Sequence, residues 1–123
     1  MRRLLVLACA CLVLTLAGCD ALPWRKPAEA AAPTLVSGLA GLAMDQGDRR
    51  RTLDVLETMP SGQATKWRNP ETGDSYVMTP TRTFERGGAT CRDYVVDAWV
   101  AGRPDKFTGT ACRDGDGGWR AQP

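Results

Sequence analysis

The five cysteines are the residues of this chain with the most definite chemistry, and they fall into two groups. Cys9, Cys11 and Cys19 lie within or directly after an apolar N-terminal run, whereas Cys91 and Cys112 lie far along the chain. The chain has no histidine, so it has no Ser-His or Cys-His nucleophile pair and no histidine general base. Two isolated thiols cannot complete a tetrahedral zinc shell. We therefore expect neither a metal ion nor another cofactor.

Carboxylates are the remaining candidates for catalysis. Asp93 and Asp97 share a face of a predicted strand, as solvated strand carboxylates often do. The run Asp114-Gly115-Asp116-Gly117-Gly118 superficially suggests calcium, but the further oxygens and distal Glu of an EF-hand loop are absent. A tight turn before a last strand at Trp119 is the favoured interpretation. The sequence also has no phosphate-binding glycine loop, so it predicts a protein that is not an enzyme.

The N-terminus has the pattern of a targeting signal. Arg2 and Arg3 precede an apolar run from Leu4 to Leu16, and Leu16-Ala17-Gly18-Cys19 follows. This pattern resembles that of bacterial lipoproteins, which implies that residues 1–18 are a removable signal peptide and that Cys19 is the lipidation site. Two or three acyl chains would anchor the protein to a membrane, because each buried methylene contributes about 0.8 kcal/mol. The alternative is an ordinary secretory signal cut at a small residue.

Export predicts a disulfide, and the charge balance argues against nucleic-acid binding. Cys91 and Cys112 would form a disulfide in an oxidising exported compartment. The whole chain has a net charge of +2, which Arg2 and Arg3 supply, so the part from Cys19 onward is neutral. A neutral surface of mixed charge lacks the basic patch that nucleic-acid binding requires.

The elements expected after Cys19 are a tether, a helical segment and a β domain. Residues 19–33 are rich in Ala and Pro, as in a flexible tether. Residues 34–59 are predicted to be helical, with a break near Gly47 and a better helix over 48–58. Antiparallel strands are predicted over 63–123, so the fold class is α+β. The helical prediction depends on the spacing of Leu35, Leu39, Leu42, Leu53 and Leu56.

Two hairpins are predicted in the β domain. In the first, Asn69-Pro70-Glu71-Thr72-Gly73 forms the turn between strands at 63–68 and 74–79, and Trp67 faces Tyr76. In the second, Ala101-Gly102 is the turn. This register opposes Cys91 to Cys112 in a non-hydrogen-bonded pair, where a disulfide fits.

The same register of the second hairpin explains other residues. Asp97 opposes Lys106, and Pro104 falls where the ladder does not need its missing N–H. The opposite face is apolar, with Tyr94, Val96, Ala98 and Val100 against Phe107, Gly109 and Ala111. A shift of one residue would lose most of these matches.

Several short motifs carry a family resemblance. Trp67-Arg68-Asn69-Pro70-Glu71-Thr72-Gly73, Cys91-Arg92-Asp93-Tyr94, Gly109-Thr110-Ala111-Cys112-Arg113 and Asp116-Gly117-Gly118-Trp119 occur in this order. They resemble the C-terminal domain of the rickettsial 17-kDa surface antigen family. The resemblance implies a lipid-anchored outer-membrane protein without a defined enzymatic activity or catalytic residues. Asp20, directly after Cys19, suggests retention at the periplasmic face of the inner membrane as the alternative.

Two functions remain open besides an envelope enzyme. The first is a structural or interaction module with an envelope protein as partner, in which the motif aromatics form the core: Trp67, Tyr76, Tyr94 and Trp119. The second is a module that binds a small ligand or envelope polymer through exposed aromatics, beside Arg68, Arg82 and Arg92. The exposure of Trp67, Trp99 and Trp119 distinguishes these functions.

Overall fold

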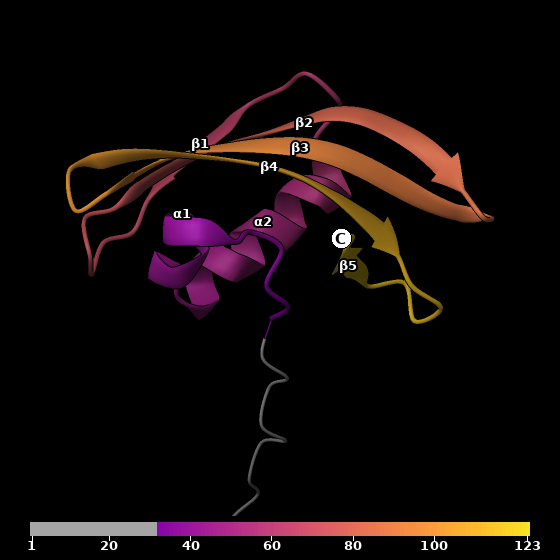
Figure 1. Cartoon of the computed structure of the whole chain (residues 1–123), viewed down its shortest axis with the longest axis horizontal. Coiled ribbons are helices and arrows are strands. Elements are labelled where there is room, and N and C mark those ends of the chain that lie inside the picture. The colour runs from indigo at the N-terminus through magenta and orange to yellow at the C-terminus, as the bar shows by residue number, and fades with distance from the viewer. Residues whose placement is uncertain (1–31) are drawn as a thin grey trace, which may run out of the picture.

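The computed structural model describes residues 32–123, in which two helices lie under a curved antiparallel sheet (Figure 1). The predicted signal peptide, Cys19 and the predicted tether up to residue 31 lie outside the described residues. Among residues 32–123 no helix combines the length and apolar character needed to cross a bilayer.

The sheet consists of five strands in the order of the sequence. They are β1 (Thr65–Arg68), β2 (Ser75–Arg86), β3 (Ala89–Val100), β4 (Arg103–Arg113) and β5 (Trp119–Ala121). Every neighbouring pair is antiparallel. Because the helices precede all the strands, the predicted α+β class is confirmed.

The first predicted hairpin is confirmed in its register. Trp67 faces Tyr76, and the centroids of their rings lie 5.4 Å apart. The Asn69 N–H donates to the Asp74 carbonyl at 2.8 Å, which closes the turn. Strand β1 begins at Thr65, two residues later than predicted.

The second predicted hairpin is also confirmed. Cys91 opposes Cys112 and Asp97 opposes Lys106, and the disulfide joins Cα atoms that are 4.0 Å apart. The two turn residues both have positive φ, 50° at Ala101 and 74° at Gly102. This is the turn geometry that matches the right-handed twist of two paired strands.

A central hairpin between β2 and β3 is present that the sequence analysis did not predict. It turns at Gly87-Gly88, and both glycines have positive φ. Strand β2 therefore continues to Arg86 instead of ending at Thr79, and its register against β3 shifts between Pro80 and Arg82. The bulge at this point lets the strand pass a proline, which cannot donate to a regular ladder.

The helical segment is divided differently from the prediction. Helix α1 spans Gly38–Ala43 and helix α2 spans Gln46–Thr58. The break falls at Met44 and Asp45, because Asp45 caps α2, and Gly47 lies inside the helix.

The leucine spacing is the part of the helical prediction that is wrong. Leu35 is buried but precedes α1, whereas Leu39 and Leu42 are on α1 and exposed. The i, i+4, i+7 pattern assumed one continuous helix from residue 34, but the chain becomes helical only at Gly38.

The core lies between the helices and the concave face of the sheet (Figure 1). Alternate residues of β3 point into it, and the predicted apolar face of this strand is buried. The core aromatics are Trp67, Tyr76, Tyr94 and Trp119, as the scaffold hypothesis predicted.

Candidate interaction surface

The first motif fixes the N-terminus of α2 to the sheet. Asp48 is buried, and its carboxylate accepts hydrogen bonds from Trp67 Nε1 at 2.9 Å and Asn69 Nδ2 at 2.8 Å. Asn69 Nδ2 also donates to Asp45 Oδ2 at 2.7 Å, and Asp45 and Asp48 form a capping box. Trp67 and Asn69 therefore bind the helix end to the sheet through their side chains, and Asn69 also borders an open recess of about 330 Å³ beside Arg51 and Glu71.

The surroundings of this helix end shift the pKa values of two groups. Hydrogen bonds from the Asp48 backbone and the Asn69 side chain lower the pKa of Asp45. Burial, followed by the nearby carboxylate of Asp48, raises the pKa of Tyr76 to about 12. The Tyr76 hydroxyl therefore stays protonated at physiological pH.

The second motif fixes the C-terminus of α2. The buried Arg92 guanidinium donates to the carbonyl oxygens of Leu56 and Met59, each at 2.6 Å, and to Thr83 Oγ1 at 3.0 Å. These carbonyls belong to the last turn and cap of the helix, where acceptors lack partners within the helix. Burial lowers the pKa of Arg92, but a guanidinium remains charged at physiological pH.

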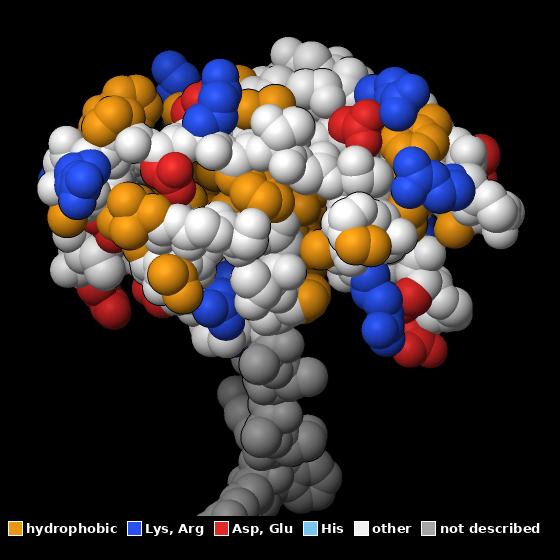
Figure 2. Space-filling model, viewed as in Figure 1, with side chains coloured by type: hydrophobic (Ala, Val, Ile, Leu, Met, Phe, Trp, Pro, Cys, Tyr) orange, Lys and Arg blue, Asp and Glu red, His pale blue; other side chains and the backbone are white. Residues whose placement is uncertain are grey.

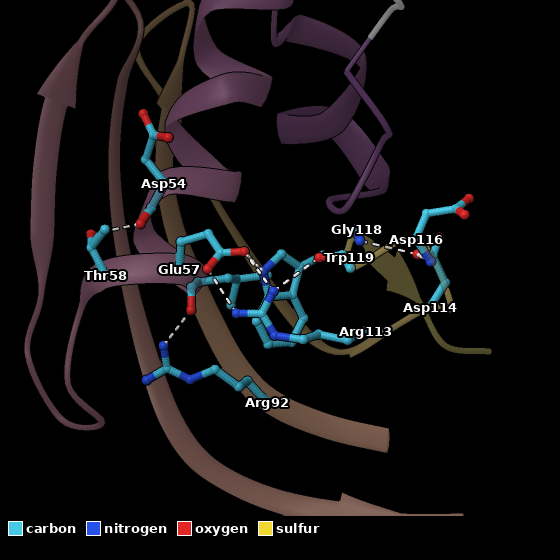
Figure 3. Close-up of polar contacts among 11 residues, drawn as sticks. Asp54, Glu57, Thr58, Arg92, Arg113, Asp114, Asp116, Gly118 and Trp119 are labelled. Carbon is cyan, nitrogen blue, oxygen red and sulfur yellow. Dashed lines mark hydrogen bonds and ion pairs between the residues drawn. The ribbon is translucent and has the colours of Figure 1, made fainter. Parts of the chain in front are cut away.

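The third and fourth motifs meet on Glu57 (Figure 3). Arg113 pairs with Glu57 through both nitrogens, at 2.6 and 2.7 Å, while its Cζ lies 4.5 Å from the centroid of the Trp119 ring. Trp119 Nε1 donates to Glu57 at 3.2 Å. The hydrogen bond from Arg113 lowers the pKa of Glu57.

Two further motif residues hold the segment before α1. The buried Tyr94 hydroxyl donates to the Leu35 carbonyl. Gly109 lies across the ladder from Tyr94, and a Cβ at Gly109 would lie 2.6 Å from the Phe107 ring and 2.9 Å from the Tyr94 hydroxyl. Glycine at 109 therefore makes room for the tyrosine that holds residue 35.

The acidic run at 114–118 forms the predicted turn. Asp114 Oδ1 accepts from the N–H groups of Asp116 and Gly118, both at 3.0 Å, and Asp114 Oδ2 pairs with Arg120 at 2.9 Å. Within residues 32–123 no group of three or more His, Cys, Asp or Glu residues could hold a metal ion.

The candidate carboxylates Asp93 and Asp97 are not brought together as a catalytic pair. Asp93 pairs with Arg82 at 3.0 Å and Thr110 at 2.5 Å, and these bonds, Thr110 first, lower its pKa. Asp97 pairs with Lys106 at 3.5 Å. Four residues along one strand separate them by about 13 Å, beyond the carboxylate spacing of glycosidases.

The convex outer face of the sheet is the surface that these internal contacts leave open. The helices contact the sheet from the concave side (Figure 1). Trp99 on the outer face is 53% exposed, whereas Trp67 and Trp119 are buried. A shallow recess of about 270 Å³ beside Trp99 is bordered by Asp97, Pro104 and Lys106. Basic and acidic side chains lie among hydrophobic ones along this side of the molecule (Figure 2).

Among the strand residues of this outer face, basic side chains outnumber acidic ones. The strand register and the alternating burial place two acidic strand residues there, Asp93 and Asp97, and Asp114 of the following turn pairs with Arg120. The basic residues that share it are Lys66, Arg68, Arg82, Arg86, Lys106 and Arg120.

The three arginines of the binding hypothesis have different environments. Arg92 is buried under α2, away from the outer face. Arg68 and Arg82 are exposed, and Arg82 lies over the Phe84 ring at 4.3 Å. The sequence did not predict Asp48 and Glu57, the carboxylates that accept hydrogen bonds from the motif side chains. The D-x-x-D spacing of Asp45 and Asp48, which resembles a capping box, was a signal for the first of them.

The arrangement of these motif residues agrees with a family match. Residues 54–120, more than half of the chain, match the model of a family described as 17 kDa outer membrane surface antigen. The chain belongs to this surface antigen family. The resemblance found in the motifs is thereby confirmed, and the structure shows that these motif residues bind α2 and the segment before α1 to the sheet.

Curated relatives agree with the match. The 17 kDa surface antigen of Rickettsia bellii is 38% identical over 85 residues, which are 65% of this chain and 54% of the relative. That of Rickettsia conorii is 39% identical over 82 residues, 63% of this chain and 52% of the relative. The chain thus spans about half the length of the surface antigens it matches. No solved structure matches the chain.

Proposed function

We propose that this surface antigen family member is a lipid-anchored, non-catalytic protein of the cell envelope, which presents the outer face of its sheet to an envelope partner. Residues 1–18 would be the signal peptide and residues 19–33 the lipidated tether. The observation that carries the proposal is the internal use of the motif residues: Trp67, Asn69, Arg92, Arg113 and Trp119 all bind other elements of the fold.

The family description and the N-terminal sequence support an outer-membrane location. The description names an outer membrane surface antigen, and Cys19 follows a lipoprotein-like signal. Retention at the inner membrane through Asp20 is the alternative. Separation of the two membranes, followed by immunoblotting of the wild-type chain and an Asp20→Ser variant, distinguishes the two locations.

The intact mass of the protein extracted from membranes tests the anchor. We expect the mass of residues 19–123 plus acyl chains, with no free thiol, because Cys91 and Cys112 are joined. A Cys19→Ser variant should lose the acyl mass and leave the membrane fraction. An unacylated wild-type mass would contradict the proposal.

Binding of an acidic envelope polymer is a second candidate, favoured by Trp99. An exposed tryptophan can stack on a sugar ring, and the basic residues of the outer face suit carboxylates. Co-sedimentation with purified peptidoglycan tests this function. Trp99→Ala should reduce the bound fraction several-fold, whereas Thr108→Ala, an exposed control on the same face, should not.

A further inference from the structure

Helix α1 exposes two large apolar side chains. Leu42 is 87% exposed and Leu39 is 43% exposed. Ala40, between them in the sequence, is completely buried, and Leu42 lies about 200° around the helix from it. The leucines therefore point away from the sheet against which α1 packs.

The orientation of α1 is fixed by contacts on its buried side. The Ala40 N–H donates to Asp105 Oδ2 of β4 at 2.8 Å. A Cβ at Gly41 would lie 2.0 Å from the Val36 carbonyl oxygen, so α1 packs closely on the chain that precedes it. The helix cannot rotate its leucines inward without breaking these contacts.

The chain enters the fold beside α1. The first described segment, residues 32–37, lies on the helical side of the molecule, opposite the outer face of the sheet (Figure 1). Cys19 precedes Ala32 by 13 residues. A fully extended segment of that length spans at most about 45 Å, and a flexible one has a root-mean-square length of about 20 Å.

We propose that α1 docks on the lipid surface that carries the anchor, with Leu42 and Leu39 inserted at the boundary between headgroups and acyl chains. The proposal rests on the lipid anchor at Cys19. A short tether gives the membrane a high effective concentration, so a contact of only two leucines suffices. Docking on this side turns the outer face of the sheet, with Trp99, away from the membrane and toward a partner.

A fluorescence measurement on the acylated protein tests the docking. The protein is reconstituted in vesicles of phosphatidylethanolamine and phosphatidylglycerol that contain a nitroxide lipid as quencher. An environment-sensitive label is placed at Ser37→Cys, next to α1, where the serine is exposed and makes no side-chain cap bond. The control label is at Thr108→Cys, exposed on the outer face.

We expect several-fold stronger quenching at position 37 than at position 108, and a marked loss of that quenching when Leu42→Ser is added. Equal quenching at both positions, in protein that still floats with the vesicles, would overturn the docking and leave the anchor intact. Quenching that Leu42→Ser does not change would show proximity through the tether alone and would also overturn it. Protein without acyl chains that does not float would overturn the anchor and, with it, the docking.

Discussion

Arg92 connects strand β3 to the C-terminal end of α2. Its guanidinium donates to two backbone carbonyls and a threonine hydroxyl from a buried position. Without Arg92, the carbonyl oxygens that accept these hydrogen bonds would be buried without a charged donor, which costs free energy of folding.

Replacement of Arg92 should therefore destabilise the fold. We expect Arg92→Met to lower the free energy of unfolding by about 2–4 kcal/mol, because it leaves buried carbonyls without their donors. Arg92→Lys should be intermediate, since an ammonium lacks the planar fork that reaches both carbonyls. Urea unfolding followed by circular dichroism measures the change.

The control for Arg92 is Arg82→Met. Arg82 is exposed and pairs with Asp93 at the surface, so its loss should change stability by no more than about 1 kcal/mol. An equal effect of the two substitutions would contradict a special role for Arg92.

At the scale of the element, α2 has a weak apolar face and depends on its ends. Within its sequence Thr52, Val55 and Leu56 are buried, and Asp48 at the first turn is buried as well. A buried carboxylate is tolerated here because Trp67, Asn69 and the Asp45 N–H all donate to it.

Asp48→Ala should release the start of this helix. The substitution removes the capping box and leaves Trp67 Nε1 without its acceptor, so we expect a loss of about 2–4 kcal/mol. Asp54→Ala on the exposed side of α2 is the matched control and should stay within about 0.5 kcal/mol. Thermal unfolding compares the two, and amide exchange in residues 46–52 should increase in the Asp48 variant alone.

At the scale of the whole molecule, the disulfide closes the β3–β4 hairpin at its open end. Cys91 and Cys112 are 21 residues apart in the sequence. The double variant Cys91→Ala, Cys112→Ala should lose about 3 kcal/mol, chiefly because its unfolded chain is less restricted. Chemical unfolding with and without reductant measures this loss. Reductant should leave the double variant unchanged, and a similar shift in both proteins would contradict the prediction.

Acid should also destabilise the molecule. The pKa values of Glu57, Asp45 and Asp93 are lowered in the fold from ordinary values of 4.5, 3.8 and 3.8. A carboxylate with a lowered pKa stabilises the fold above its ordinary pKa, and this contribution is lost as the pH falls through the lowered value. The free energy of unfolding should thus decrease as the pH drops below about 4.5.

Glu57→Gln serves as the control for this acid effect. The Glu57 side chain is 43% exposed, so its contribution to the pH-dependent free energy of unfolding is small. The variant should lose slightly less stability than the wild type between neutral and acidic pH. Urea midpoints across this pH range make the comparison. An identical pH dependence in both proteins would contradict the assignment.

The two hairpins with clear turns could be predicted residue by residue. Strand pairing alternates with a period of two, and once Ala101-Gly102 is the turn, every partner down to Cys91 and Cys112 follows. The central hairpin was not predicted, although Gly87-Gly88 is also a turn signal. Pro80 interrupted the β pattern ahead of it, and the bulge that accommodates this proline follows from pairing with β3.

The sequence by itself determined the family, the fold class, the disulfide and the registers of two hairpins, because these depend on local turns, period-two patterns and short motifs. Only the tertiary structure decided what the motif residues do. The Arg92–Leu56 and Arg113–Glu57 contacts join residues 36 and 56 positions apart. It also decided that Leu39 and Leu42 face outward, because the packing of α1, unlike the spacing of its leucines, selects which side of the helix is buried.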